Sequence, residues 1–138
     1  MKTRILYIPF ILLLCTTQYV TACNFNKKEE LQNILQLIIS SNELNKYYHV
    51  DVLPDRKPLR ILNNNVVPET TQLNLFDMEV EYTTKKENLP YLVFENILEK
   101  NNSIIVSFRY PPEGIHGTAF IKRANLVWII EKIIIKEN

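Results

Sequence analysis

The first periodic pattern of apolar residues lies between residues 27 and 47. Large apolar side chains recur there at the spacing of one helical face, and three more widen the stripe: Leu31, Ile34, Leu35 and Ile38, then Leu37, Ile39 and Leu44. Asn26, followed three residues later by Glu29, is a capping-box pattern. The sequence therefore predicts one long amphipathic helix over residues 27–47.

Between residues 75 and 84 the pattern changes to alternation. Apolar residues take the even positions and acidic residues stand between them: Phe76, Met78, Val80 and Tyr82 against Asp77, Glu79 and Glu81. A period of two is typical of a strand with one buried face. We therefore predict a half-buried strand with an acidic outer face.

The C-terminal residues predict a series of antiparallel strands over 91–99, 103–110, 116–123 and 126–136. Residues typical of turns separate these runs: Asn101-Asn102, Pro111-Pro112-Glu113-Gly114 and Ala124-Asn125. One long helix followed by a four- to five-stranded antiparallel β-meander predicts a single α+β domain over residues 27–138. Its core is expected to join the helical stripe to six strand residues: Phe76, Met78, Val80, Ile104, Val106 and Phe108.

The connection over residues 49–74 has no clear period. Pro54, Pro58 and Pro68 interrupt any regular element, and only Leu59–Leu62 is typical of a short strand. A connection of this length in a compact domain usually wraps an edge or lines a site.

The N-terminus has the organisation of a secretory signal peptide. Lys2 and Arg4 precede the apolar run 5–15, which is too short to cross a bilayer of about 30 Å as a helix. The alternative for this run is a buried N-terminal strand. We predict that residues 1–22 are a signal peptide that is removed on export.

The residues at the end of this segment, Val20-Thr21-Ala22-Cys23, resemble the lipobox of bacterial lipoproteins. The resemblance implies cleavage between Ala22 and Cys23 and attachment of a diacylglycerol to the Cys23 thiol. After cleavage Cys23 is the one remaining cysteine, so no intramolecular disulfide can form. Lipidation gives this thiol a role, and residues 23–26 then form the lipidated cysteine and a short tether. The alternative is ordinary cleavage after Ala22, which gives a soluble secreted protein with a free thiol.

Charge and glycine content exclude several functions. The chain has 16 basic and 15 acidic side chains, and removal of residues 1–22 leaves 14 and 15. A near-neutral domain lacks the charge expected of a nucleic-acid-binding protein. The two glycines, Gly114 and Gly117, are too few for a phosphate-binding loop, a dinucleotide-binding turn or a nucleophile elbow.

Candidate catalytic chemistry is sparse. His49 lies two residues from Asp51, but neighbours at this spacing on an extended chain usually point apart, and His116 lies in a predicted hairpin. Asp77, Glu79 and Glu81 share one strand face at about 6–7 Å, a spacing that suits a carboxylate pair or a calcium ion. Such a row is more often a solvated face paired with cations such as Arg109, Lys122 or Arg123. We expect no catalytic site, metal or cofactor.

The order of elements is similar to the cystatin-like superfold, including its nuclear-transport-factor-like branch, in which a bent sheet wraps a helix. The residues that carry this likeness are the hairpin Tyr110-Pro111-Pro112-Glu113-Gly114 and the late Leu126-Val127-Trp128. The superfold includes enzymes, ligand carriers, immunity proteins and scaffolds, so the resemblance does not assign a role.

The last predicted strand is apolar on both faces. Trp128, Ile130 and Ile134 are assigned to the core together with Lys132, whose charge a bulge or snorkelling would accommodate. This leaves an outer row that we predict to be a partner surface, for a homodimer or an envelope protein: Val127, Ile129, Ile133, Ile135 and Ile105. The alternative is that residues 49–74 fold back and cover it.

These observations favour a non-catalytic binding protein, tethered by lipid to a membrane of the bacterial cell envelope. Its partner would be another protein, as in immunity proteins and inhibitors. The alternative function is a small-molecule-binding or enzymatic domain with a polar cavity inside the sheet.

Overall fold

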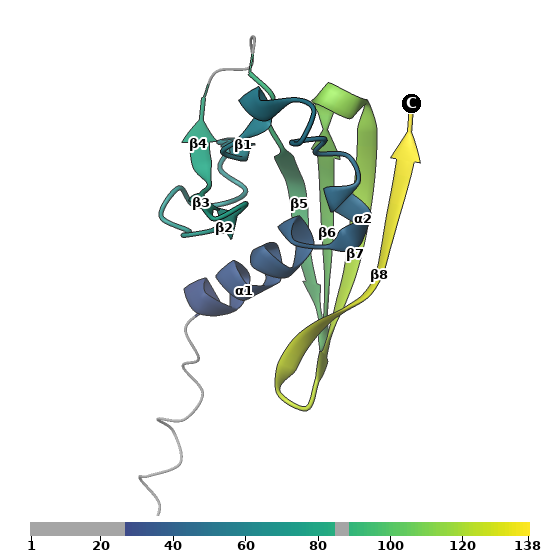
Figure 1. Cartoon of the computed structure of the whole chain (residues 1–138). Helices are drawn as coiled ribbons and strands as arrows, with labels where there is room; N and C mark the ends of the chain where they lie inside the picture. Colours follow the sequence, from purple (N-terminus) through teal and green to yellow (C-terminus); the bar gives the residue numbers. More distant parts are fainter. Residues whose placement is uncertain (1–26, 85–88) are drawn as a thin grey trace, which may run out of the picture.

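The computed structural model describes residues 27–84 and 89–138. The predicted signal peptide, its cleavage site at Ala22 and the predicted lipid attachment at Cys23 lie outside the described residues. Figure 1 shows an antiparallel sheet with helices and short strands on one of its faces. The predicted α+β class is therefore confirmed, and residues 27–138 supply both layers.

The predicted single helix over residues 27–47 is wrong in its length. Helix α1 covers Lys27–Ile39, and a separate turn of helix, α2, covers Asn42–Asn45. Ser41 has extended backbone angles, and its side chain accepts a hydrogen bond from the Leu44 N–H at 3.3 Å. Serine hydroxyls favour this N-cap position over a helix interior, so Ser41 ends one helix and begins the next.

The main sheet has the order β5-β6-β7-β8, with all neighbours antiparallel. Its strands match the predicted meander within a few residues: β5 Val93–Lys100, β6 Ser103–Tyr110, β7 Ile115–Ala124 and β8 Val127–Glu137. The short 3-10 helix η2, Pro111–Glu113, followed by Gly114 at φ 63°, reverses the chain between β6 and β7. The last turn lies at Asn125-Leu126 rather than at Ala124-Asn125, and both of its residues have positive φ.

The remaining elements are short and lie beside the helix layer (Figure 1). They are the 3-10 helix η1 and four strands: η1 Pro54–Arg56, β1 Arg60–Leu62, β2 Asn74–Leu75, β3 Met78–Glu79 and β4 Glu81–Thr83. The prediction of one strand over residues 75–84 is wrong. Phe76 and Asp77 both have positive φ and form a two-residue turn between β2 and β3. The segment with the alternating pattern therefore folds as a hairpin.

The core lies between α1 and the inner face of the main sheet. Ile34, Leu35 and Ile38 are at most 1% exposed, and they form one cluster with the inner residues of β6, which are Ile104, Val106, Phe108 and Tyr110. Leu59, Ile61, Val67 and Leu73 join the same cluster. Residues 49–74 therefore contribute to the inner core and do not fold back over the outer face. The prediction that Met78 belongs to the core is wrong, because its side chain is exposed on the β2–β3 hairpin.

A bulge divides β8 into two halves with opposite phase. Phe120 pairs with Lys132 and the adjacent Ile121 pairs with Ile130, so Glu131 is an extra residue on β8. Before the bulge Trp128 and Ile130 pack against the core, and after it Ile133 and Ile135 do so, which leaves Ile134 on the outer face. The bulge also turns Lys132 away from the core.

Candidate functional site

The outer face of the main sheet carries an apolar row. Leu98 on β5, Ile105 on β6 and Phe120 on β7 are directly opposite one another in the strand register, and opposed residues in an antiparallel sheet share a face. Leu98 is 53% exposed, and Ile105 and Phe120 are partly exposed. Ile129 lies beside the row on β8 and is 39% exposed. We call Leu98, Ile105, Phe120 and Ile129 the outer-face row.

The predicted partner surface differs from the outer-face row. The structure places Val127, Ile129 and Ile105 on the outer side, whereas Ile133 and Ile135 pack against the core. The prediction that all five share one face is wrong because it assumed unbroken alternation through β8. The sequence-based prediction missed Leu98 and Phe120. Each alternates with the buried residues of its strand, so its side chain could have been expected on the outer face.

The rim of the outer-face row is basic. Arg109 pairs with Glu95 at 2.7 Å, and Lys122 pairs with Glu131 at 2.8 Å. In the described part of the chain, three further lysines on the outward positions of the same sheet form no ion pair: Lys100, Lys132 and Lys136. The outer face therefore combines an apolar centre with uncompensated positive charge.

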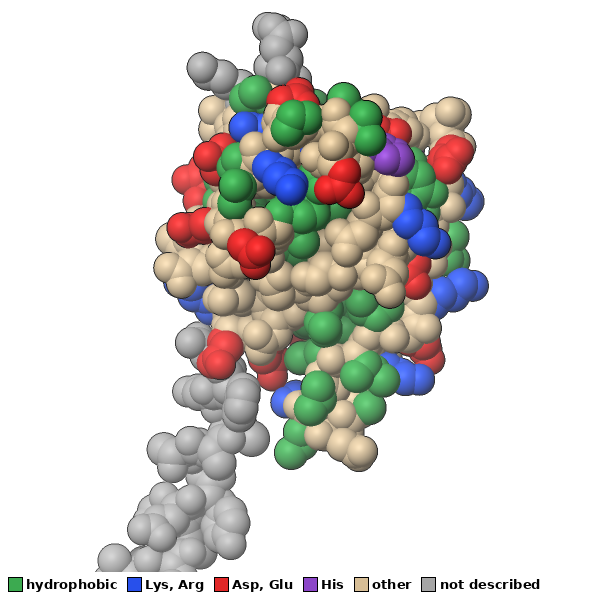
Figure 2. Space-filling view, viewed as in Figure 1, with side chains coloured by type: hydrophobic (Ala, Val, Ile, Leu, Met, Phe, Trp, Pro, Cys, Tyr) green, Lys and Arg blue, Asp and Glu red, His purple; other side chains and the backbone are tan. Residues whose placement is uncertain are grey.

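The β7–β8 hairpin lies against α1 and forms a groove with it. Arg123 Nη2 is 3.3 Å from Glu30 Oε1, and the Arg123 guanidinium lies 5.5 Å from the centre of the Trp128 ring. The groove has a volume of about 390 Å³ between the polar side chains of α1 and the apolar tip of the hairpin. Figure 2 shows hydrophobic side chains gathered on this protruding hairpin. Leu126 is 84% exposed at the turn, and Val127 is 62% exposed beside it.

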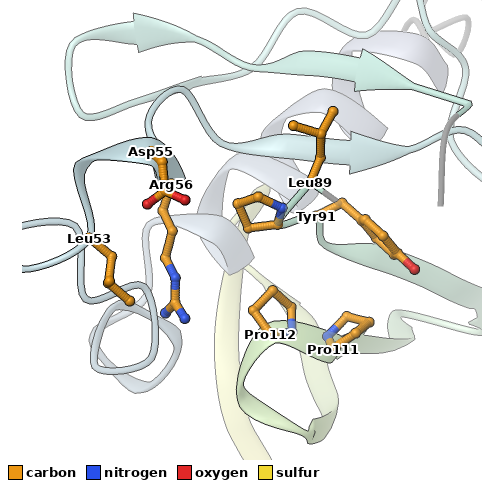
Figure 3. A pocket seen from close by; sticks show the side chains of 8 residues that line it. Leu53, Asp55, Arg56, Leu89, Tyr91, Pro111 and Pro112 are labelled. Atoms are coloured by element: carbon orange, nitrogen blue, oxygen red, sulfur yellow. The ribbon is translucent and has the colours of Figure 1, made fainter. Parts of the chain in front are cut away.

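A second, shallower cleft of about 470 Å³ lies at the opposite end of the molecule. In Figure 3, Leu53 and Arg56 lie on one side of the cleft, Leu89 and Tyr91 lie on another, and Pro111 and Pro112 lie below them in this view. Most of the side chains that line this cleft are apolar.

Arg56 holds the segments around this cleft together. Its Nη1 lies 2.5 Å from Glu113 Oε1, and it donates to the backbone carbonyls of Tyr47 and Tyr48, each at 3.2 Å. The guanidinium also lies 5.8 Å from the centre of the Tyr110 ring. Burial raises the pKa of Tyr110 to about 12, although the Arg56 charge opposes the shift. Because Nη1 contacts Glu113 and two backbone carbonyls and the side chain is only 10% exposed, we assign Arg56 to stabilising the cleft rather than to binding a ligand.

The two histidines do not form the arrangement considered from sequence. His49 Nε2 lies 3.6 Å from Glu113 Oε2, so its acidic neighbour is Glu113 and not Asp51. His116 points outward on β7, opposite Arg109 and Lys136. Sequence reasoning missed the contacts of Arg56 and His49 with Glu113 because more than fifty positions separate these residues from it.

The acidic residues of 75–84 are not on one strand face. Asp77 lies in the β2–β3 turn, Glu79 is on β3, and Glu81 pairs with Arg60 at 3.3 Å. The cations proposed from sequence, Arg109, Lys122 and Arg123, pair elsewhere. Among the residues that the structure describes, no group of three or more histidine, cysteine, aspartate or glutamate side chains is placed to hold a metal ion.

No helix within the described ranges is long and apolar enough to span a membrane. Comparison of the chain with models of protein families, with curated proteins and with solved structures finds no match.

Proposed function

We propose that this chain is a non-catalytic binding protein, tethered to a membrane of the bacterial cell envelope through a diacylglycerol on Cys23. The observation that supports a binding role is the outer-face row with its basic rim. Exposed apolar residues that are contiguous across several strands are typical of interaction sites. Lys100, Lys132 and Lys136 around them favour a protein partner with an apolar centre and an acidic rim.

We also propose that the α+β fold is cystatin-like. It is supported by the position of α1 across one face of an antiparallel sheet, which leaves the other face available. The alternative function requires a polar cavity inside the sheet. On the inner face of the sheet, where such a cavity would lie, the side chains of Ile104, Val106 and Phe108 are apolar and 7% exposed or less. We therefore prefer the binding role.

The partner surface is tested by capture from intact cells with the membrane-anchored protein. Leu98→Glu places an acid in the outer-face row, where it repels an acidic partner and disrupts apolar contact. Met78→Glu is the matched control, because Met78 is 45% exposed on the β2–β3 hairpin, away from the main sheet. We expect Leu98→Glu to lose the captured partner and Met78→Glu to keep it, with both variants folded. Equal capture by the two variants would contradict the proposal.

The tether is tested by detergent partition and mass spectrometry. The native protein is expected to enter the detergent phase, and Cys23→Ala to release it in soluble form. An unmodified Cys23 at the mature N-terminus would overturn lipid anchoring and leave simple secretion.

A further inference from the structure

The tip of the β7–β8 hairpin is more apolar and more exposed than its turn requires. Leu126 has a φ of 67° and Asn125 a φ of 49°, as in the two-residue turns that favour Asn-Gly. Glycine or asparagine adopts the second position with little strain, whereas leucine is uncommon there. A strained position that exposes a large apolar side chain indicates a function for that side chain rather than for the turn.

The hairpin tip lies at the same end of the molecule as the start of α1. Figure 1 shows the β7–β8 turn and the first residues of α1 at the lower end, opposite η1, η2 and the C-terminus. The contact between Arg123 and Glu30 fixes this arrangement, because Glu30 lies in the first turn of α1. The tip therefore has a fixed position relative to the point where the chain enters the domain.

The proposed tether is short compared with the size of the domain. Four residue steps separate Cys23 from Lys27, and a fully extended chain spans at most about 14 Å over that length. A lipid on Cys23 therefore holds the first turn of α1 close to the membrane surface. The adjacent hairpin tip is then within reach of the same surface.

We propose that the hairpin tip, Leu126 and Val127, inserts into the interfacial region of the bilayer. This inference rests on the proposed function, because the lipid on Cys23 brings the tip to the membrane. Interfacial elements place apolar side chains about 5–10 Å into the boundary between headgroups and acyl chains. The nearby charges of Lys122 and Arg123 are paired with Glu131 and Glu30, so apolar contact drives the insertion of the tip. Lys100 lies at the same end of the sheet and forms no ion pair with a described residue, so it adds attraction to anionic lipid. Insertion fixes the orientation of the domain, which the flexible lipid alone does not.

Two features of the sequence make the proposal directly measurable. Trp128, next to Val127, is the single tryptophan of the chain, and Cys23 is the single cysteine after residue 22. A chain that starts at Cys23 contains every residue of the core described above. Its thiol can be coupled to maleimide lipid in vesicles of phosphatidylethanolamine and phosphatidylglycerol, which supplies the tether chemically. Acyl-chain-brominated lipids in the same vesicles then quench Trp128 if it lies at the membrane.

For the coupled protein we expect quenching of Trp128 emission by the brominated lipids. In the double variant Leu126→Asn/Val127→Thr, asparagine suits the positive φ of position 126 and threonine suits the strand at position 127, so the variant should fold. Because it lacks the apolar side chains of the tip, it should lose the quenching. Val52→Thr is the matched control: Val52 is 78% exposed and lies two residues before η1, which is at the opposite end of the molecule, so this variant should keep the quenching. Circular dichroism establishes that all three proteins are folded.

Absence of quenching in the folded, coupled wild-type protein would overturn the proposal, as would unchanged quenching in the double variant. The first result would leave a protein partner as the occupant of the tip. Because the coupling replaces the natural lipid, an unmodified Cys23 in cells would refute the proposed anchoring without changing the vesicle result. Failure of the anchoring and failure of the insertion are therefore distinguishable.

Discussion

Gly117→Ala should destabilise the protein, although alanine normally suits a strand better than glycine. Gly117 on β7 lies directly opposite Phe108 on β6, and the Phe108 ring lies over the glycine backbone. A Cβ at Gly117 would overlap Cζ and Cε2 of that ring. The ring is fully buried in the core, so it cannot swing into solvent.

The magnitude follows from two opposing effects. Replacing a strand glycine by alanine reduces the entropy of the unfolded chain and stabilises by about 0.4–1 kcal/mol where there is space. Overpacking a filled core costs about 1–3 kcal/mol. Because the clash is with a buried aromatic ring on the neighbouring strand, the packing cost dominates. We expect a net loss of about 1–2 kcal/mol in the free energy of unfolding.

Urea unfolding of a double-mutant cycle separates the two effects. Phe108→Leu alone leaves space above Gly117 and should destabilise the protein. In the Phe108→Leu background, Gly117→Ala should cost much less than in the wild type, because the residues are in contact and couple. Gly117→Ala that is as stable as the wild type would refute the reasoning. So would an equal cost in both backgrounds.

Two further predictions concern the core and the buried tyrosine. Leu35→Ala should lower the free energy of unfolding by about 2–5 kcal/mol, because Leu35 is fully buried. Leu37→Ala, on the exposed side of α1, should change that free energy little. Similar urea midpoints for the two variants would contradict the core assignment. Tyr110 has a folded-state pKa of about 12 against 10.0 for an ordinary tyrosine, so its contribution to stability is full below about pH 10 and is lost as the pH rises toward 12. Urea midpoints over that range should fall less steeply for Tyr110→Phe than for the wild type, and equal slopes would show that Tyr110 ionises normally when folded.

The strands that were predicted correctly have a regular pattern and a clear turn at each end. In residues 103–110 every even position is apolar and every odd position except Ile105 is polar, and β6 covers the same residues. Asn101 adopts the positive φ that favours asparagine in turns. In such segments the hydrophobic period and the turn residues lead to the same structure, so no knowledge of the tertiary fold is needed.

The errors arose where a polar group could be satisfied in two ways or where the period changed within a run. Ser41 fits a helix interior by spacing, but its hydroxyl caps the next helix. The alternation of residues 75–84 continues through Phe76-Asp77, and nothing in the pattern distinguishes a strand from a hairpin with an apolar turn residue. The contacts of Glu113 with Arg56 and His49 depend on tertiary structure alone.

The bulge at Glu131 determines which surfaces the sheet can offer. Continued alternation through β8 would have placed Lys132 and Ile134 in the core and would have exposed Ile133 and Ile135 in one long apolar row. One extra residue reverses the phase, so that Ile133 and Ile135 are partly buried against the core and Lys132 joins the basic rim. On β8 the outer face consequently carries the apolar Ile129 before the bulge and the charged Lys132, opposite Phe120, after it. The exposed apolar residues of the hairpin, Leu126 and Val127, also lie before the bulge, and Val127 is two positions from Ile129 on the same outer face. The exposed apolar residues therefore continue from the hairpin tip, next to α1, onto the sheet face. The two ends of this surface fit a protein that contacts a membrane and a partner at the same time.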